Sequence, residues 1–312
     1  MSSTDTERSG AGGEGTDTER SGTGGMRIET LDSSPTLGVL YGRALLTARS
    51  GGSTLPERTL ELAGMRIDAD AVADYNQVCG FSVGGAVPPT YPHMLAFPLQ
   101  MRLMTDREFP LPAPGMVHLR NVITQARSPE VGEPLRLTVH ADRLAAHPKG
   151  AQVDLVTEVV DADDDEIWRS RSTYFVRGAP APEGADDVPD APPEPDPHVG
   201  RLPHAIWRIP GDIGRRYAAV SGDVNPIHVN GLAAKAFGMP GTIAHGMWTK
   251  ARALAALAGR YGPAFTVDVV FTAPVRAPSK VYFHTAAVDG GWDATLVSPK
   301  GRDHLLLTLR EA

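Results

Sequence analysis

The chain has 312 residues, a formal net charge of −7, 41% hydrophobic residues and 21% charged residues, values typical of globular rather than disordered or fibrous proteins. Its acidic balance argues against a nucleic-acid-binding protein, which normally carries a basic face. Its one cysteine, Cys79, excludes an internal disulfide framework and any zinc site built from cysteines.

The first 25 residues are predicted to form a tail. The segment TDTERSG occurs twice, at 4–10 and at 16–22. A segment of glycine, serine, threonine and charged residues cannot bury enough apolar surface to offset chain entropy, so we expect residues 1–25 to be disordered. Neither this tail nor the later sequence contains the apolar run of a secretory signal or a membrane span. We therefore expect a cytoplasmic protein with no membrane-spanning segment.

A second stretch without an apolar pattern, residues 179–203, separates the chain into two halves. It mixes prolines with acidic residues, as in Pro193-Glu194-Pro195-Asp196. Proline removes backbone donors and like charges repel one another, so this stretch is predicted to be an extended linker. The ordered chain then divides into residues 26–178 and 204–312, and each part is long enough to have its own core.

Both halves show the same succession of patterns, in which a short and then a longer helical segment precede four strand-like runs. The runs lie at 115–125, 133–142, 151–160 and 167–177 in the first half, and at 265–273, 280–288, 292–298 and 303–310 in the second. The longer helix of the second half, 246–258, has an apolar face at the 3.6-residue period. Short gaps between runs favour antiparallel strands, whose apolar face the helix can cover. The prediction is an α+β fold with two antiparallel sheets, each wrapped around one long helix.

Residue-level similarity between the halves supports a duplication. Residues 75–81 can be aligned with 217–223, and 88–93 can be aligned with 240–245 in the same order. In this alignment Phe81 stands at the place of Asp223, and Met94 stands at the place of Gly246. The first half is therefore predicted to be a copy without catalytic groups.

The densest polar segment, Ser221-Gly222-Asp223-Val224-Asn225-Pro226-Ile227-His228, is a candidate catalytic turn. Asn225 followed by Pro226 is typical of an N-cap and the first residue of a helix, and Gly222 allows a sharp turn before it. Such a turn brings Asp223 and His228 close together, and a carboxylate beside an imidazole makes an acid–base pair. Two other interpretations stay open: simple helix capping beside a surface histidine, and a metal site, which the lack of a nearby cysteine disfavours.

A second candidate is Gly246, which directly precedes the long apolar-faced helix of the second half. The first amides of a helix have no acceptor inside the helix and carry the positive end of its dipole. The N–H of Gly246 is therefore a candidate donor to a carbonyl oxygen that becomes enolate-like. The alternative is a glycine that merely allows a tightly packed helix start. His245 is expected to cap or pack rather than to act as a second base.

Together the two segments closely resemble the MaoC-like (R)-specific enoyl-CoA hydratase (hydratase 2) family of hot-dog folds. The pattern Y-x-x-x-S-G-D-x-N-P-I-H begins at Tyr217, and the pattern G-x-I-x-H-G-M begins at Gly241. The resemblance is close over about residues 211–259 and weaker through the strands to 312. The first half resembles the degenerate hot-dog of double-hot-dog hydratases, in particular actinobacterial dehydratases of (3R)-hydroxyacyl thioesters.

The resemblance implies a role for each matched residue. Asp223 and His228 would activate the water that adds across the C2=C3 bond of a trans-2-enoyl thioester, or remove it from a (3R)-3-hydroxyacyl thioester. Asn225 would orient that pair, and the Gly246 N–H would polarise the thioester carbonyl. No metal or other cofactor is expected, because the carrier, coenzyme A or acyl carrier protein, is part of the substrate.

Some alternatives remain open at this point. The enzyme could be a hot-dog thioesterase, which attacks C1 instead of C3, or the protein could bind acyl thioesters without catalysis. Arg276-Ala277-Pro278-Ser279 stands where family members usually carry Gly-Asp after Pro-Val, which leaves the grip on the pantetheine arm or carrier unsettled. Two hot-dogs in one chain could act as a pseudo-dimer or could pair again as a homodimer.

Overall fold

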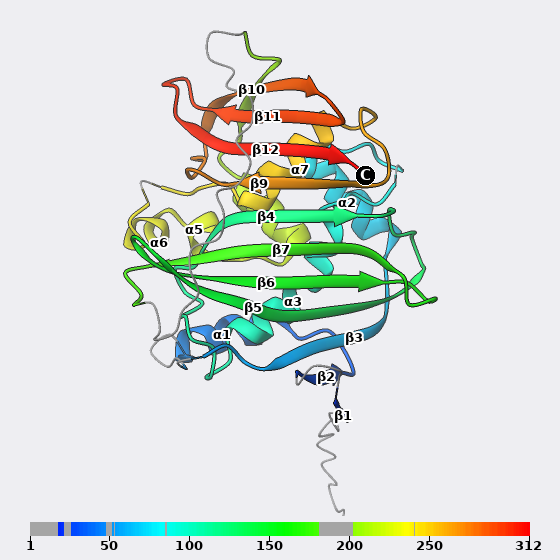
Figure 1. Ribbon diagram of the computed structural model, residues 1–312. Helices are drawn as coiled ribbons and strands as arrows, with labels where there is room; N and C mark the ends of the chain where they lie inside the picture. Colours follow the sequence, from blue (N-terminus) through cyan, green and yellow to red (C-terminus); the bar gives the residue numbers. More distant parts are fainter. Residues whose placement is uncertain are drawn as a thin grey trace, which may run out of the picture.

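Each half of the chain wraps a curved sheet around one long helix, as shown by the computed structural model in Figure 1. The structure describes residues 18–21, 26–47, 52, 54–84, 86–180, 202–239 and 241–312. The first half contains β1 (Thr18–Ser21), β2 (Arg27–Leu31), α1 (Leu37–Thr47), β3 (Arg58–Arg66), α2 (Ala69–Cys79), α3 (Tyr91–Met104), β4 (Val117–Gln125), β5 (Pro134–His147), β6 (Gly150–Val160) and β7 (Glu166–Arg177). The second half contains β8 (Ala205–Ile209), α4 (Ile213–Ser221), α5 (Pro226–Val229), α6 (Gly231–Ala236), α7 (Gly246–Ala256), β9 (Phe265–Val270), β10 (Ser279–Val288), β11 (Gly291–Val297) and β12 (Asp303–Glu311).

The predicted tail and linker lie largely outside the described residues. Within residues 1–25, Thr18–Ser21 form strand β1, antiparallel to β2, and the rest of the segment is not among the described residues. Backbone groups alone can make such a pairing, which explains why no apolar pattern marks it. Residues 181–201, most of the predicted linker, also lie outside, so the domain boundaries remain predictions.

The strand order shows the duplication directly. It runs β1-β2-β3-β5-β6-β7-β4-β9-β12-β11-β10-β8, so the order from β3 to β4 is repeated in reverse from β9 to β8. The equivalent strands β4 and β9 pair antiparallel at the centre, from Arg120 opposite Val270 to Gln125 opposite Phe265. Within the described residues, the two predicted sheets are thus one continuous sheet of 12 strands, because each half's edge strand is paired with that of the other. β2 and β3 form a parallel pair at one end of it.

Polar contacts across β4 and β9 fasten the halves together. Arg120 of β4 donates through Nε and Nη2 to the two carboxylate oxygens of Asp268 of β9, at 3.0 and 2.6 Å. Beneath the sheet, fully buried Lys250 of α7 donates to the backbone and side-chain oxygens of Asn121 at 2.8 and 2.6 Å, and to the carbonyl of Val267 at 3.3 Å. The ammonium therefore has three acceptors inside the core, so its burial does not leave an unmatched donor.

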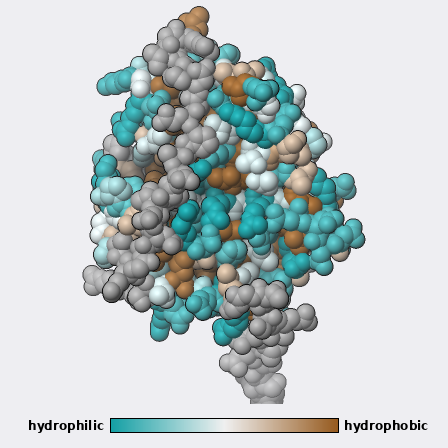
Figure 2. Space-filling view, in the orientation of Figure 1, coloured by the Kyte–Doolittle hydropathy of each residue, from teal (hydrophilic) through white to brown (hydrophobic). Residues whose placement is uncertain are grey.

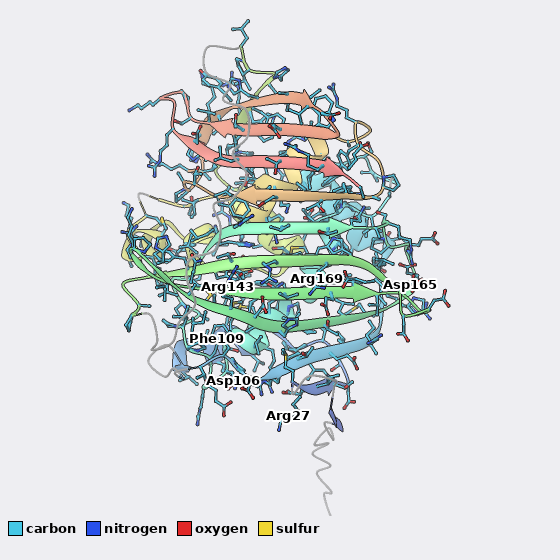
Figure 3. All side chains as sticks on the ribbon, viewed as in Figure 1. Arg27, Asp106, Phe109, Arg143, Asp165 and Arg169 are labelled. Atoms are coloured by element: carbon cyan, nitrogen blue, oxygen red, sulfur yellow. The ribbon has the colours of Figure 1, made fainter. Side chains whose placement is uncertain are left out.

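The core lies between the inner face of the sheet and the helices α3 and α7. Met247, Ala251 and Leu254 of α7 are 6% exposed or less, as their helical spacing predicts. The three methionines of α3, Met94, Met101 and Met104, are packed in the same core. The outer face carries ion pairs such as Arg143–Asp154 and Arg169–Glu158, with both arginines labelled in Figure 3. Figure 2 shows hydrophilic residues over much of this face.

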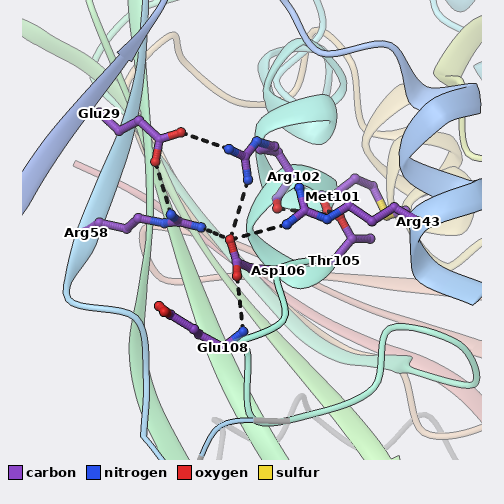
Figure 4. A network of polar contacts seen from close by, with 8 residues as sticks. All are labelled: Glu29, Arg43, Arg58, Met101, Arg102, Thr105, Asp106 and Glu108. Carbon is purple, nitrogen blue, oxygen red and sulfur yellow. Dashed lines mark hydrogen bonds and ion pairs between the residues drawn. The ribbon is translucent and has the colours of Figure 1, made fainter. Parts of the chain in front are cut away.

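A polar network near the end of α3 attaches α1 to the rest of the first half (Figure 4). The carboxylate of Asp106 pairs with Arg58 of β3, with Arg102 of α3 at 3.5 Å and with Arg43 of α1 at 3.6 Å. Glu29 of β2 pairs with the same Arg58 and Arg102, at 3.2 and 3.0 Å. Four separate elements therefore meet at two carboxylates, which fixes where α1 lies.

No helix in the described part of the chain is long and apolar enough to cross a membrane.

Candidate active site

The candidate catalytic turn begins where α4 ends. Gly222 is the C-cap, with φ 71°, and its N–H donates to the carbonyl of Ala218 at 2.9 Å. A side chain here would be strained, and its Cβ would lie 2.3 Å from Leu37 Cδ1 of α1. Asn225 then caps α5, its side-chain oxygen accepting from the N–H of Ile227 at 3.4 Å, as the Asn-Pro pattern predicts.

The Asp223 carboxylate accepts hydrogen bonds from its own turn and from α1 of the first half. Its Oδ1 accepts from the N–H of Asn225 at 3.1 Å and from the hydroxyl of Tyr41 at 2.8 Å. The Asp223 N–H donates to Ser221 Oγ at 3.1 Å, so Ser221 supports the turn. A quarter of the Asp223 side-chain surface remains exposed, which leaves the carboxylate accessible to a small molecule.

Two histidines stand beside this carboxylate. The rings of His228 and His245 stack with centroids 3.6 Å apart, and Asp223, His228 and His245 offer ligand atoms within 4.8 Å of one another. His228 Nδ1 lies 2.9 Å from the carbonyl of Ile243, and His245 Nε2 lies 2.9 Å from the carbonyl of Asp223. Because a carbonyl only accepts, each of these nitrogens carries the proton. His228 therefore presents the lone pair of its Nε2.

Burial sets the charges of this group. It lowers the pKa of His228, and it lowers that of His245 to about 3 with the help of the neighbouring His228 ring. Burial also opposes ionisation of Asp223. Attraction to the positive charge that His245 and His228 carry when protonated, together with the hydrogen bonds from Tyr41 and Asn225, outweighs that effect and holds the pKa of Asp223 below the usual value. At neutral pH the site thus contains an ionised carboxylate and two neutral imidazoles.

Gly246 is the first residue of α7, directly after His245. At this position its N–H has no acceptor inside the helix and lies at the positive end of the helix dipole. Three ring carbons of Phe271 lie 3.3 Å from the place where a Cβ of residue 246 would be. The absent side chain therefore gives the ring room beside the backbone.

The segment before α7 is fixed by the turn at residues 274–279. Ala244 N–H donates to the carbonyl of Val275 at 2.8 Å, and Ala277 N–H donates to the carbonyl of Thr242 at 3.0 Å. Ile243 also bridges Arg276, and it is the carbonyl of Ile243 that accepts from His228. The 274–279 turn thus holds the backbone that orients His228 and His245.

All four residues predicted from the sequence meet in one region. Asp223, Asn225 and His228 lie on one turn, and Gly246 follows the histidine that stacks on His228. Asn225 reaches Asp223 through its backbone N–H, while its side chain caps α5. The side chain of His245 makes no cap bond; it stacks on the His228 ring and donates to the carbonyl of Asp223. That it does not act as a second base stays a prediction.

Tyr41 is the contact that sequence reasoning missed. It lies on α1, 182 residues away from Asp223, and α1 was not among the predicted elements. A signal for this helix does exist: Leu37, Leu40, Tyr41 and Ala44 recur at helical spacing. That pattern does not indicate that Tyr41 contacts Asp223 in the second half of the chain.

Asp223, His228 and His245 are also the kind of set that can hold a metal ion. Two of the four imidazole nitrogens already donate to carbonyl oxygens, at 2.9 Å each. The other two nitrogens, His228 Nε2 and His245 Nδ1, keep their lone pairs, and a carboxylate next to the His228 lone pair serves proton transfer without further groups. That no metal is required stays a prediction.

The equivalent turn of the first half has lost these groups. Gly80 is the C-cap of α2 with φ 83°, matching Gly222, but Phe81 replaces the aspartate. His93, the counterpart of His245, is buried within 3.4 Å of Gln100 instead of beside a carboxylate. The counterpart helices α2 and α4 still pack together, with the rings of Tyr75 and Tyr217 6.0 Å apart.

Comparison with known proteins agrees with this geometry. The sequence profile of the MaoC-like domain matches residues 202–298. The chain is 41% identical over 257 residues to 3-hydroxyacyl-thioester dehydratase X of Mycobacterium tuberculosis. The aligned region covers 82% of this chain and 90% of that relative. The chain belongs to the MaoC-like dehydratase family.

Solved structures show the same fold for this MaoC-like chain. The crystal structure of HtdX of Mycobacterium tuberculosis is similar with a TM-score of 0.72 and 39% identity, covering 82% of this chain and 100% of that one. A MaoC-like dehydratase from Phytophthora capsici has a TM-score of 0.64 at 17% identity, covering 81% and 95%. These findings confirm the predicted α+β double hot-dog fold, the predicted family and the predicted class of enzyme, a hydratase or dehydratase.

Proposed function

We propose that this MaoC-like chain interconverts trans-2-enoyl thioesters and (3R)-3-hydroxyacyl thioesters in fatty acid metabolism, with Asp223 and His228 as the catalytic pair. The observation that carries the proposal is the ionised Asp223 carboxylate beside the free Nε2 of His228, next to the first amide of α7. The name of the M. tuberculosis relative, a 3-hydroxyacyl-thioester dehydratase, supports the substrate class.

The charge states of the pair decide where the added proton comes from. The ionised carboxylate of Asp223 and the Nε2 of His228 are both proton acceptors. The one N–H of the His228 ring, on Nδ1, donates a hydrogen bond to the carbonyl of Ile243. In hydration, the water oxygen bonds to C3 and the π electrons of C2=C3 move toward the carbonyl oxygen. One acceptor takes a proton from that water, and C2 receives one proton from the pair. The same water molecule therefore supplies both the hydroxyl and the hydrogen.

Negative charge develops on the thioester oxygen during that step. A backbone N–H placed at a helix start is suited to stabilise it, because the amide is fixed before the reaction begins. The N–H of Gly246 is such a donor, and the Phe271 ring lies 3.3 Å from the place where a Cβ of residue 246 would be, so this backbone is closely packed. Asn225 contributes by orienting Asp223, and Ser221 by holding the turn.

Crotonyl-CoA tests the proposal, using absorbance of the conjugated thioester and a thiol reagent in parallel. We expect the enoyl absorbance to fall without release of free thiol, and the product to be the (3R) isomer. Asp223→Asn and His228→Ala should each lower turnover by roughly 10²–10⁴, the usual contribution of a positioned acid or base. Wild-type turnover in both variants would refute the assignment of the pair.

The same assay distinguishes the alternatives. Release of thiol would indicate a thioesterase, and binding of the thioester without loss of absorbance would indicate an acyl-thioester-binding protein. We further propose that no metal takes part, so turnover should survive prolonged incubation with EDTA. The proposal also includes a thioester carrier that is coenzyme A or acyl carrier protein, a homodimeric state and a cytoplasmic location.

A further inference from the structure

The hydroxyl of Tyr41 connects the first half of the chain to the candidate catalytic carboxylate. It donates to Asp223 Oδ1 at 2.8 Å, across 182 residues of sequence. We propose that Tyr41 is a positioning residue, which fixes the orientation and the charge of Asp223 and makes the active site depend on both halves. This inference rests on the proposed function, because it assumes that Asp223 is the catalytic carboxylate.

The helix α1 brings Tyr41 to this place by packing on two surfaces. Leu40 and Ala44 are 4% and 5% exposed and hold one face of α1 in the core of the first half. Leu37 lies against Gly222, where any side chain on residue 222 would overlap its Cδ1. The helix therefore contacts the turn of the second half one residue before Asp223.

The polar network of Figure 4 also anchors this helix. Arg43 is two residues from Tyr41 and pairs with Asp106 at 3.6 Å. Asp106 is only 12% exposed and also pairs with Arg58 and Arg102. Its pKa is lowered because the N–H of Glu108 and the arginines outweigh its burial, so the carboxylate is charged. The position of Tyr41 is thus set by buried contacts rather than by the chance orientation of a surface side chain.

The division of contacts between the two carboxylate oxygens gives Tyr41 its role. Oδ1 accepts from Tyr41 and from the Asn225 N–H, whereas Oδ2 lies 3.6 Å from His245 Nε2. Burial, and the charge of Asp223 itself, raise the pKa of the Tyr41 phenol, so it remains a neutral donor. With Oδ1 engaged by two donors, Oδ2 is the oxygen left for water.

The titratable groups that face Asp223 come from three elements. They are Tyr41 of α1, His228 of α5 and His245 before α7. His93, Tyr174 and Tyr217 interact with its charge at longer range. Tyr41 is the group among these that donates a side-chain hydrogen bond to the carboxylate, so removing its hydroxyl alters the carboxylate while leaving the two imidazoles in place.

The test is Tyr41→Phe, which removes the hydroxyl and keeps the packed ring. A hydrogen bond to a charged group stabilises the carboxylate by the equivalent of about 1–2 pH units. We therefore expect the acidic limb of the kcat profile to move up by that amount, with kcat lowered about tenfold near the limb and KM changed less than kcat. Tyr261→Phe is the matched control, because Tyr261 packs on Phe265, and burial, not a neighbouring charge, raises its pKa to about 12. It should leave the profile unchanged.

A double variant separates positioning from a general loss of structure. In an Asp223→Asn background, Tyr41→Phe should cause less than a twofold further loss, because the charge on which it acts is gone. The inference is overturned if the acidic limb of Tyr41→Phe stays in place, if Tyr261→Phe moves it equally, or if Tyr41→Phe lowers the Asp223→Asn rate by its full factor. Wild-type turnover in Asp223→Asn itself would instead refute the proposed function. Thermal unfolding of each variant identifies any that are misfolded, and Tyr41→Leu would then replace Tyr41→Phe as the variant without a side-chain hydrogen-bond donor.

Discussion

Replacing Gly246 by proline tests whether its amide stabilises the thioester oxygen. The backbone accepts this change, because residue 246 is the first of α7, where proline is tolerated. His245 before it has φ −65° and ψ 141°, the extended conformation that proline requires of its neighbour. The substitution therefore removes the N–H without breaking the helix.

Gly246→Ala is the matched control for the added side chain. A Cβ on either residue meets the Phe271 ring at 3.3 Å, so the ring must give by a few tenths of an ångström in both variants. We expect each to lose no more than about 1–3 kcal/mol of unfolding free energy, the usual range for mild overpacking. Only the alanine variant keeps the donor.

The difference in activity between the two variants measures the amide. Removing one donor to a developing oxyanion costs about 10²–10³ in kcat, or roughly 3–4 kcal/mol. We expect kcat/KM for crotonyl-CoA hydration to fall by that factor from Gly246→Ala to Gly246→Pro, with both variants showing a cooperative unfolding transition. Equal kcat/KM in the two variants would show that this N–H is not the oxyanion donor.

The remaining predictions concern packing and pH. Gly214→Ala places a Cβ 2.0 Å from the His228 carbonyl oxygen, so the turn must move. We expect the free energy of unfolding, measured in urea, to fall by about 1–3 kcal/mol and turnover to fall strongly. Gly231→Ala is the control, because a Cβ there has open space around it, and it should change neither quantity. Burial lowers the pKa of His93 to about 4 and, together with His228, that of His245 to about 3. Below pH 6.5 the unfolded chain then binds more protons than the folded one, so stability should fall by about 1.6 kcal/mol for each histidine between pH 6.5 and pH 5. An unfolding free energy that is flat over this range would contradict the assigned neutral states.

The regular elements could be predicted because their patterns are local. The strand run at 303–310 is β12 almost to the residue, and the helix predicted at 246–258 is α7, Gly246–Ala256. The short β8 was missed, because five residues with alternating burial give too weak a period. The joining of the halves through β4 and β9 was missed for another reason: strand pairing depends on which edges meet in space, and no single run contains that information.

The active site divides in the same way. Asp223, Asn225 and His228 lie within six residues of one another, so their proximity follows from one tight turn. Their charge states do not, because they depend on how deeply the surrounding elements bury them. The role of the turn around Arg276, which holds the backbone next to His228, likewise becomes visible only when Ile243 is seen paired with it.

The pairing of β4 with β9 affects the ligand stoichiometry. A dimer of two equal hot-dog subunits offers two reactive turns for each assembled sheet, whereas here Phe81 occupies the place of the second aspartate. A tight-binding thioester analogue should therefore saturate the protein at one equivalent per polypeptide. The first half can then change its sequence to suit the binding of substrate at the active site of the second half. A substitution in the first half alters one reaction centre, whereas a substitution in a symmetric dimer alters two.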